Sequence, residues 1–139
     1  MMNKNLIFVL LILLLLFIGC SNKVELGGKV TFSDDGTPLG VGEVCFETDT
    51  YFARGKLKPD GSYVVGSLSA KDGIPPGNYR VYIIDAEEKT GEKDKFGTEI
   101  TEQLIDIKFT SSLTSGLTAD VSKSLKRFDF KVDRYTGQK

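Results

Sequence analysis

Apolar and polar residues alternate along several short stretches of the chain. In LGGKVTF (residues 26–32), Val30 and Phe32 share one face, and polar residues stand between and before them. In LKRFDFKVD (residues 125–133), aromatic and aliphatic residues alternate with charged ones. A period of two over such a length predicts a half-buried β-strand. The same pattern predicts further strands at 42–48, 51–57, 62–68, 78–86 and 115–122.

Turn-forming residues separate these stretches. SDDG (residues 33–36) and KPDG (residues 58–61) place Asp before Gly, where a turn requires positive φ, and the adjacent prolines Pro75 and Pro76 exclude a helix. No convincing amphipathic helix stands between the predicted strands. We therefore expect an all-β domain over residues 26–133, an antiparallel β-sandwich of about seven strands. Tyr63 and Tyr79 are expected to face inward, and 78–86, apolar on both faces, to be a central strand.

Residues 87–102 interrupt the alternation. The stretch EEKTGEKDKFGTEITE is charged, carries two glycines and almost lacks apolar periodicity. It predicts a long exposed loop or a locally disordered segment. Long loops on rigid sandwiches often carry function, so this segment is the best candidate for contact with a partner. The alternative interpretation is a solvated excursion without a role.

The first twenty residues point to secretion. Leu6 to Ile18 form an unbroken apolar run of 13 residues after the basic Lys4. About 20 helical residues are needed to span a bilayer, so the run fits the apolar region of a signal peptide better than a membrane span. The following FIGC resembles the lipobox of bacterial lipoproteins. The alternatives are an ordinary signal peptide with a chance cysteine, or a short membrane anchor.

The lipoprotein resemblance implies a domain layout and a location. Residues 1–19 would be removed, and Cys20 would carry a diacylglyceryl group and often a further acyl chain such as palmitate. Two or more chains hold a protein stably on a membrane. Residues 20–25 would then be a short tether and residues 134–139 a flexible tail. We expect attachment on the periplasmic face or at the cell surface, and Ser21 favours the outer membrane.

Composition narrows the chemistry. The chain has 18 basic and 19 acidic residues, a balance that does not suggest binding to nucleic acid. It has no histidine, which removes the commonest general base and metal ligand and makes Ser-His-Asp and Cys-His sites impossible. With Cys20 lipidated, Cys45 has no disulfide partner within the chain. We predict a buried structural thiol there, with a reactive or intermolecular thiol as the alternative. No cofactor is expected.

Three spaced motifs resemble one known domain. GGKVTFSDDGTPLGVGEVCF, KPDGSYVV and IPPGNYRVYI are similar to the transthyretin-like, carboxypeptidase-regulatory-like β-sandwich, and the ending TSGLT…FDFKV is similar to that of small bacterial lipoproteins with this domain. The resemblance implies the fold and makes IPPGNYRVYI part of its frame. Some transthyretin-related proteins hydrolyse 5-hydroxyisourate at a histidine-dependent site, which cannot be carried over to a chain without histidine.

Two groups of residues are candidate sites. Asp34, Asp35 and Asp49 could supply carboxylates to Ca²⁺ if loops brought them together, although turn formation explains SDDG more simply. Tyr51, Phe52 and Arg54 could form a platform for a sugar, since aromatic faces stack on sugar rings and Arg makes forked hydrogen bonds. The simpler interpretation is an ordinary strand with one buried ring.

The sequence therefore leads to one functional expectation and one alternative. We expect a membrane-anchored, non-catalytic interaction module in an envelope complex. The alternative is a module that binds carbohydrate at the cell surface. An enzyme is not expected: serine and lysine are plentiful, but no spacing singles out a catalytic pair.

Overall fold

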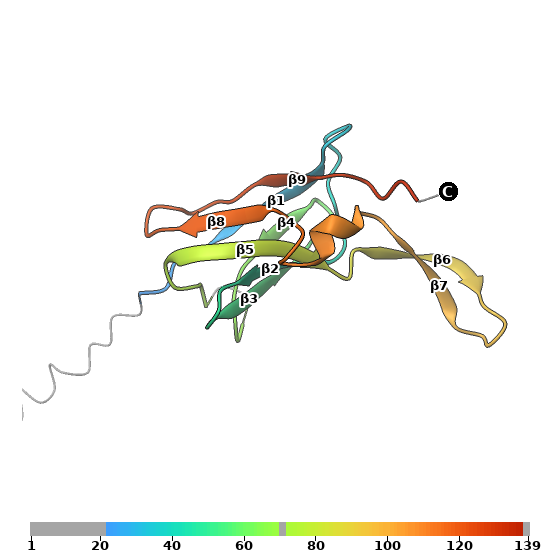
Figure 1. Cartoon of the computed structure of the whole chain (residues 1–139), viewed down its shortest axis with the longest axis horizontal. Helices are drawn as coiled ribbons and strands as arrows, with labels where there is room; N and C mark the ends of the chain where they lie inside the picture. Colours follow the sequence, from blue (N-terminus) through green and yellow to red (C-terminus); the bar gives the residue numbers. More distant parts are fainter. Residues whose placement is uncertain (1–21, 70–71, 138–139) are drawn as a thin grey trace, which may run out of the picture.

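The computed structural model describes residues 22–69 and 72–137 and shows an all-β sandwich (Figure 1). A three-stranded sheet in the order β4-β1-β9 packs on a four-stranded sheet in the order β3-β2-β5-β8. Every strand that alternation predicted is present. Their bounds are β1 Gly27–Phe32, β2 Glu43–Glu47, β3 Phe52–Lys56, β4 Ser62–Val64, β5 Gly77–Ile84, β8 Leu117–Val121 and β9 Phe130–Val132.

The core lies between the two sheets and is built from the apolar positions of the alternating pattern. Tyr63 and Tyr79 face inward, as predicted, and are 1% and 2% exposed. Burying a large apolar side chain contributes about 1.5–3 kcal/mol, so a core of this size needs no disulfide or metal. The innermost residues include Leu26, Val30, Leu39, Val44, Phe46, Val65, Ile74, Val81, Ile83, Ile105 and Val132.

IPPGNYRVYI is part of this frame. Its strand β5 lies between β2 and β8, which confirms the expected central position. The Tyr79 hydroxyl donates a hydrogen bond to the Pro75 carbonyl at 2.8 Å and so fixes the proline turn onto the strand that follows it. The outward residues Tyr82 and Ile84 are half-buried. The stretch holds the centre of the sheet together.

One pairing differs from the antiparallel sandwich that was expected. Strand β9 pairs with β1 in parallel, with Val30 opposite Phe130 and Phe32 opposite Val132. The reason is topological. Strand β8 runs antiparallel to β5 and returns the chain to the end of the sandwich where β1 begins, so the next strand in the other layer must run in the same direction as β1 (Figure 1).

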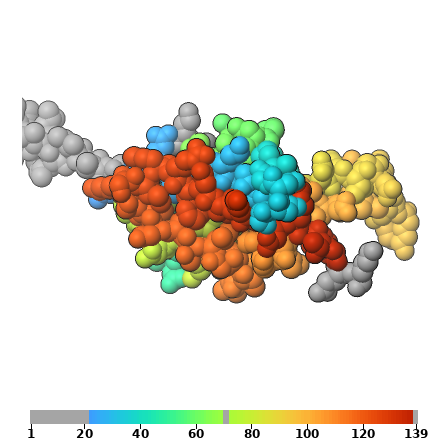
Figure 2. All heavy atoms as spheres, turned by 90° about the horizontal axis from the view of Figure 1, so that it is seen from above, coloured from blue at the N-terminus to red at the C-terminus, as the bar shows by residue number. Residues whose placement is uncertain are grey.

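The prediction of a loop or disordered segment at 87–102 was wrong. The segment folds into a hairpin of β6 (Glu87–Lys93) and β7 (Glu99–Gln103) that extends beyond the sandwich (Figures 1 and 2). Asp94 closes its turn, since Oδ1 accepts hydrogen bonds from the amides of Phe96 and Thr98 at 2.8 and 2.9 Å. Gly97 supplies the positive φ of 84° that the turn requires.

The ordered part of the chain extends further toward the C-terminus than expected. A short 3₁₀ helix, η1 (Ile107–Thr110), follows β7. Residues 134–139 were expected to be a flexible tail, yet Arg134 pairs with Ile105, and the Tyr135 amide donates to the Leu104 carbonyl at 3.0 Å. The first two residues of the expected tail therefore belong to the sandwich.

The expected signal peptide at 1–19 and the lipidation site at Cys20 lie outside the described residues. Within the described ranges, no helix has the length and apolar character needed to cross a membrane. The chain joins the sandwich at Val24, whose amide donates to the Ile74 carbonyl at 2.7 Å. Only three residues separate this first hydrogen bond from Cys20.

Candidate binding surface

Tyr51, Phe52 and Arg54 do not form a common platform. The Tyr51 ring packs against the core, edge-on to Tyr79 with ring centroids 6.4 Å apart. Phe52 and Arg54 project from the opposite, outer side of β3, where Phe52 is 45% exposed. A sugar-stacking surface needs its aromatic faces on the same side. The simpler interpretation, a strand beside one buried ring, describes these residues better.

The outer face of the four-stranded sheet is covered by cross-strand ion pairs. Arg54 on β3 lies 2.8 Å from Glu43 on β2. Arg80 on β5 lies 3.0 Å from Asp49 and 3.7 Å from Glu47. These pairs are partly exposed, so each contributes little to stability. The two arginines and their acidic neighbours are thus paired within the chain itself.

Cys45 lies beneath these pairs on the same outer face. It is opposite Arg54 on β3 and Tyr82 on β5, and it is 0% exposed. Burial, followed by the negative charge of Glu43, raises the pKa of the thiol to about 12. A thiol that stays protonated is a poor nucleophile. The prediction that Cys45 is buried is confirmed.

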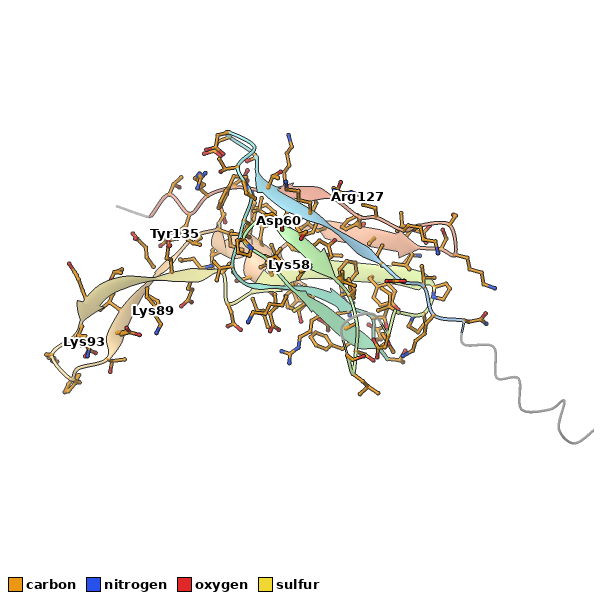
Figure 3. All side chains as sticks on the ribbon, turned by 180° about the vertical axis from the view of Figure 1, so that it is seen from behind. Lys58, Asp60, Lys89, Lys93, Arg127 and Tyr135 are labelled. Atoms are coloured by element: carbon orange, nitrogen blue, oxygen red, sulfur yellow. The ribbon has the colours of Figure 1, made fainter. Side chains whose placement is uncertain are left out.

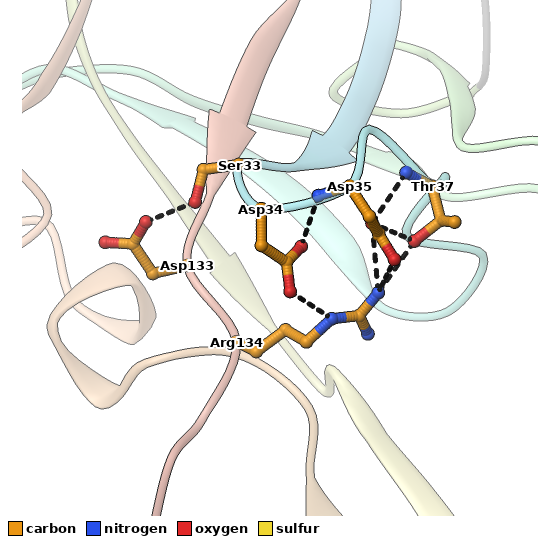
Figure 4. Close-up of polar contacts among 6 residues, drawn as sticks. All are labelled: Ser33, Asp34, Asp35, Thr37, Asp133 and Arg134. Carbon is orange, nitrogen blue, oxygen red and sulfur yellow. Dashed lines mark hydrogen bonds and ion pairs between the residues drawn. The ribbon is translucent and has the colours of Figure 1, made fainter.

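Asp34 and Asp35 belong to a turn that Arg134 closes (Figure 4). Asp35 Oδ1 accepts hydrogen bonds from the Thr37 amide and hydroxyl at 2.9 and 2.7 Å. Arg134 binds Asp34 at 2.9 Å and Asp35 at 3.0 Å. The turn interpretation of SDDG is confirmed. Asp49 is paired with Arg80 instead, and no group of three or more metal-binding side chains exists in the described part of the chain.

A second polar cluster ties the same turn to the neighbouring segments. Ser33 donates to Asp133 Oδ1 at 2.5 Å (Figure 4). Lys108 donates to Asp133 Oδ2 at 2.6 Å. The hydrogen bond from Lys108, then that from Ser33, lowers the pKa of Asp133. This Ser-Asp-Lys arrangement joins three segments of the chain: the turn after β1, the segment after β9, and η1.

The β6–β7 hairpin is the feature that the sequence interpretation missed. Every residue of both strands is exposed except Gln103, which is partly buried. Figure 3 shows Lys89 and Lys93 on this arm, away from the body of the sandwich. The signal in the sequence was DKFG, an Asp and a Gly at turn spacing between two threonines. A two-stranded hairpin without a covering element is only marginally stable in water, so a hairpin this exposed is an unusual feature of a fold.

The two faces of the hairpin differ in charge pairing. On the outer face, Lys89 forms an ion pair with Glu99, and the Thr101 hydroxyl donates to Glu87 at 2.7 Å. On the inner face, Glu88 and Glu102 are directly opposite each other in the ladder. Neither carboxylate has an ion-pair partner among residues 22–69 and 72–137. Like charges in this position repel each other.

A hollow of about 400 Å³ lies where the hairpin leaves the sandwich. Apolar and polar surface contribute about equally to its walls, which come from the loops after β1 and β3, from the base of the hairpin and from the C-terminal segment. Glu88 stands at its rim, and Val41 on its wall is 38% exposed. The lining residues are Phe32, Pro38, Leu39, Gly40, Val41, Pro59, Glu88, Leu104 and Arg134.

Comparison with known proteins adds little to this description. No protein-family model and no curated protein matches the sequence. Among solved structures, the chain is similar to part of a 9R-lipoxygenase from Cyanothece, with 16% sequence identity and a TM-score of 0.37. That alignment covers 79% of this chain and 16% of the lipoxygenase. At this level of similarity it carries no inference about fold or function.

Proposed function

We propose that the protein is a non-catalytic binding module, anchored to a membrane through lipidated Cys20, that contacts its partner with the β6–β7 hairpin. The observation that carries this proposal is the position of the hairpin. The chain enters the sandwich at one end of the long axis, and the hairpin extends from the other end (Figures 1 and 2). A domain tethered by its N-terminus would therefore hold the hairpin away from the membrane.

The chemistry of the described residues supports binding rather than catalysis. The polar clusters around Asp35 and Asp133 are engaged in joining loops, and the Cys45 thiol is protonated and covered. The hairpin, by contrast, is ordered by its own turn and ladder and covered by no other element. A surface of this kind is suited to a partner that binds across it.

The anchor and the location are parts of the same proposal. The FIGC sequence supports lipidation at Cys20, and Ser21 supports the outer membrane, on its periplasmic face or at the cell surface. The resemblance to transthyretin-like domains in small lipoproteins supports a frame that presents loops and hairpins. Partners are proposed to be other proteins of the envelope.

Site-specific photo-cross-linking in the intact envelope tests the proposal. A photoreactive amino acid would replace Phe96 in the hairpin turn, which is 81% exposed, in the full-length protein. A matched variant would carry the same group at Leu68, which is 94% exposed in the loop after β4. We expect a discrete protein adduct from position 96 that position 68 does not give. The same adducts from both positions, or none from position 96, would contradict the hairpin as the binding element.

A further inference from the structure

We infer that the inner face of the hairpin and the hollow at its base bind an extended, cationic segment of a partner protein, one that carries Lys or Arg next to an apolar side chain. This inference rests on the proposed function and specifies the chemistry of the partner.

The hairpin is a two-stranded sheet of its own, next to the four-stranded sheet of the sandwich. The Leu104 amide donates to the Ala86 carbonyl at 3.0 Å, so the β6–β7 ladder extends back into the sandwich. Ala86 is 1% exposed and faces the core. Because side chains alternate along a strand, Glu88 and Glu102 project on the same side as Ala86 and Leu104. The face of the ladder that is buried at Ala86 thus carries two exposed carboxylates further out on the hairpin.

Apolar side chains also lie near these carboxylates. Ile100 follows Glu102 on the same face by alternation and is 39% exposed. Leu104 lines the hollow, together with Val41 and two prolines. An apolar side chain of a partner would enter this hollow of about 400 Å³. The hollow therefore provides apolar contacts beside Glu88.

The charge of this face indicates a cationic occupant. Glu88 and Glu102 repel each other across the ladder, and a Lys or Arg between them would turn that repulsion into attraction. Arg134 also lines the hollow, but it is bound to Asp34 and Asp35. Across residues 87–103, six acidic residues stand against three basic ones, so the whole hairpin attracts cations. Two carboxylates without a third ligand are a poor site for a metal ion.

Peptide binding to the full-length, lipidated protein in detergent micelles tests the inference. The probe is a fluorescein-labelled hexapeptide of alternating valine and lysine, and a valine–glutamate hexapeptide is the matched control. We expect saturable binding of the lysine peptide, measured by fluorescence anisotropy, which weakens as salt is raised. Absence of binding, or equal binding of the glutamate peptide, would overturn the inference.

Paired variants locate the site. Glu88→Gln with Glu102→Gln should weaken binding about tenfold, because two charge-assisted contacts are lost. Glu87→Gln with Glu99→Gln removes the same charge from the outer face and should leave the affinity within about twofold. Val41→Lys should also prevent binding, whereas Phe52→Lys, an equal charge change on the outer face of the sandwich, should not. Equal losses in both members of either pair would overturn the site.

The two proposals can fail separately. A hairpin cross-link in the envelope without lysine-peptide binding would keep the hairpin as the binding element and reject a cationic partner. Self-association of the purified protein that disappears in the Glu88→Gln, Glu102→Gln variant would identify the occupant as a second copy of this chain and would equally reject the partner inferred here.

Discussion

The guanidinium of Arg134 lies over the ring of Phe32, with Cζ 3.7 Å from the ring centroid, while its nitrogens bind Asp34 and Asp35. Phe32 is the last residue of β1, and the two aspartates form the turn that follows. One side chain near the C-terminus thus packs on the end of the first strand and neutralises the turn beyond it. Cation–π and bidentate contacts both favour Arg over Lys here.

This cluster predicts how stability depends on acid. The hydrogen bond from the Thr37 amide, then that from its hydroxyl, lowers the pKa of Asp35 from 3.8 to about 2. A lowered folded-state pKa stabilises the fold above the unfolded pKa, and this stability is lost as pH falls from about 4 to about 2. The melting temperature should fall over that range. In Asp35→Asn the fall should be smaller, whereas an unchanged slope in this variant would show that Asp35 does not contribute.

Gly28 is predicted to be intolerant of any side chain. A Cβ at this position would lie 2.0 Å from the Phe128 carbonyl oxygen, in the middle of the three-stranded sheet. Gly28→Ala should therefore cost about 1–3 kcal/mol or more in the free energy of unfolding, measured by urea denaturation. The neighbouring Lys29→Ala, on the other face of β1, should change it by less than about 0.5 kcal/mol. Similar values for the two variants would disprove the close approach.

The Cys45 thiol should be unreactive in the folded protein. In the lipidated chain it is the free cysteine, and it is buried with a pKa of about 12. Iodoacetamide at pH 8 should alkylate it only after unfolding, as mass spectrometry would show. Arg54→Ala should uncover the sulfur and raise the rate, whereas Lys56→Ala should not. Rapid alkylation of the unsubstituted, folded protein would contradict the burial.

Cys20 should carry the membrane anchor. Cys20→Ser should abolish incorporation of labelled palmitate and release the protein from the membrane fraction. The reason is that the mature chain then carries no acyl chain to hold it on the membrane. Cys45→Ser is the matched control and should keep both properties. Label uptake by the Cys20→Ser variant would reject the lipobox.

The hairpin should be dispensable for folding. Replacing residues 88–102 by a short glycine turn removes side chains that are exposed or partly exposed at every position. The melting temperature should change by no more than a few degrees. The partner protein that cross-links to the hairpin in the intact envelope should no longer be captured. A loss of cooperative unfolding would contradict this prediction. It would mean that the hairpin stabilises the sandwich even though its side chains are exposed.

The sequence pattern predicted the strands that have one buried face. It missed the two strands of the hairpin, which have no buried face. Alternation revealed β1 and β5 because Val30, Phe32, Tyr79 and Val81 mark the core side of each strand. In the hairpin, Glu88 and Lys89 lie on opposite faces, but both are polar. The strand therefore shows no alternation of apolar and polar residues in the sequence. Its turn at Asp94 was the available signal.

The alternating pattern also could not predict which strands pair with each other, or in which direction. Alternation is the same for parallel and antiparallel neighbours, so the β1–β9 direction depended on the path of the whole chain. The candidate platform was wrong for a different reason. Within the predicted strand at 51–57, alternation already places Tyr51 on the face opposite Phe52 and Arg54, as the structure shows. The contact of Arg134 with Asp34 and Asp35 joins positions about 100 residues apart, and nothing in local composition indicates it.

The parallel pairing of β9 with β1 has a consequence for biogenesis. During synthesis, the first strand of the sandwich keeps one edge unpaired until nearly the last residues of the chain have been made. Until then β1 lacks its neighbours Phe130 and Val132, and the three-stranded sheet is incomplete. A chain cut short by ten residues would lose β9 altogether, so completion of the sandwich depends on synthesis of almost the whole chain.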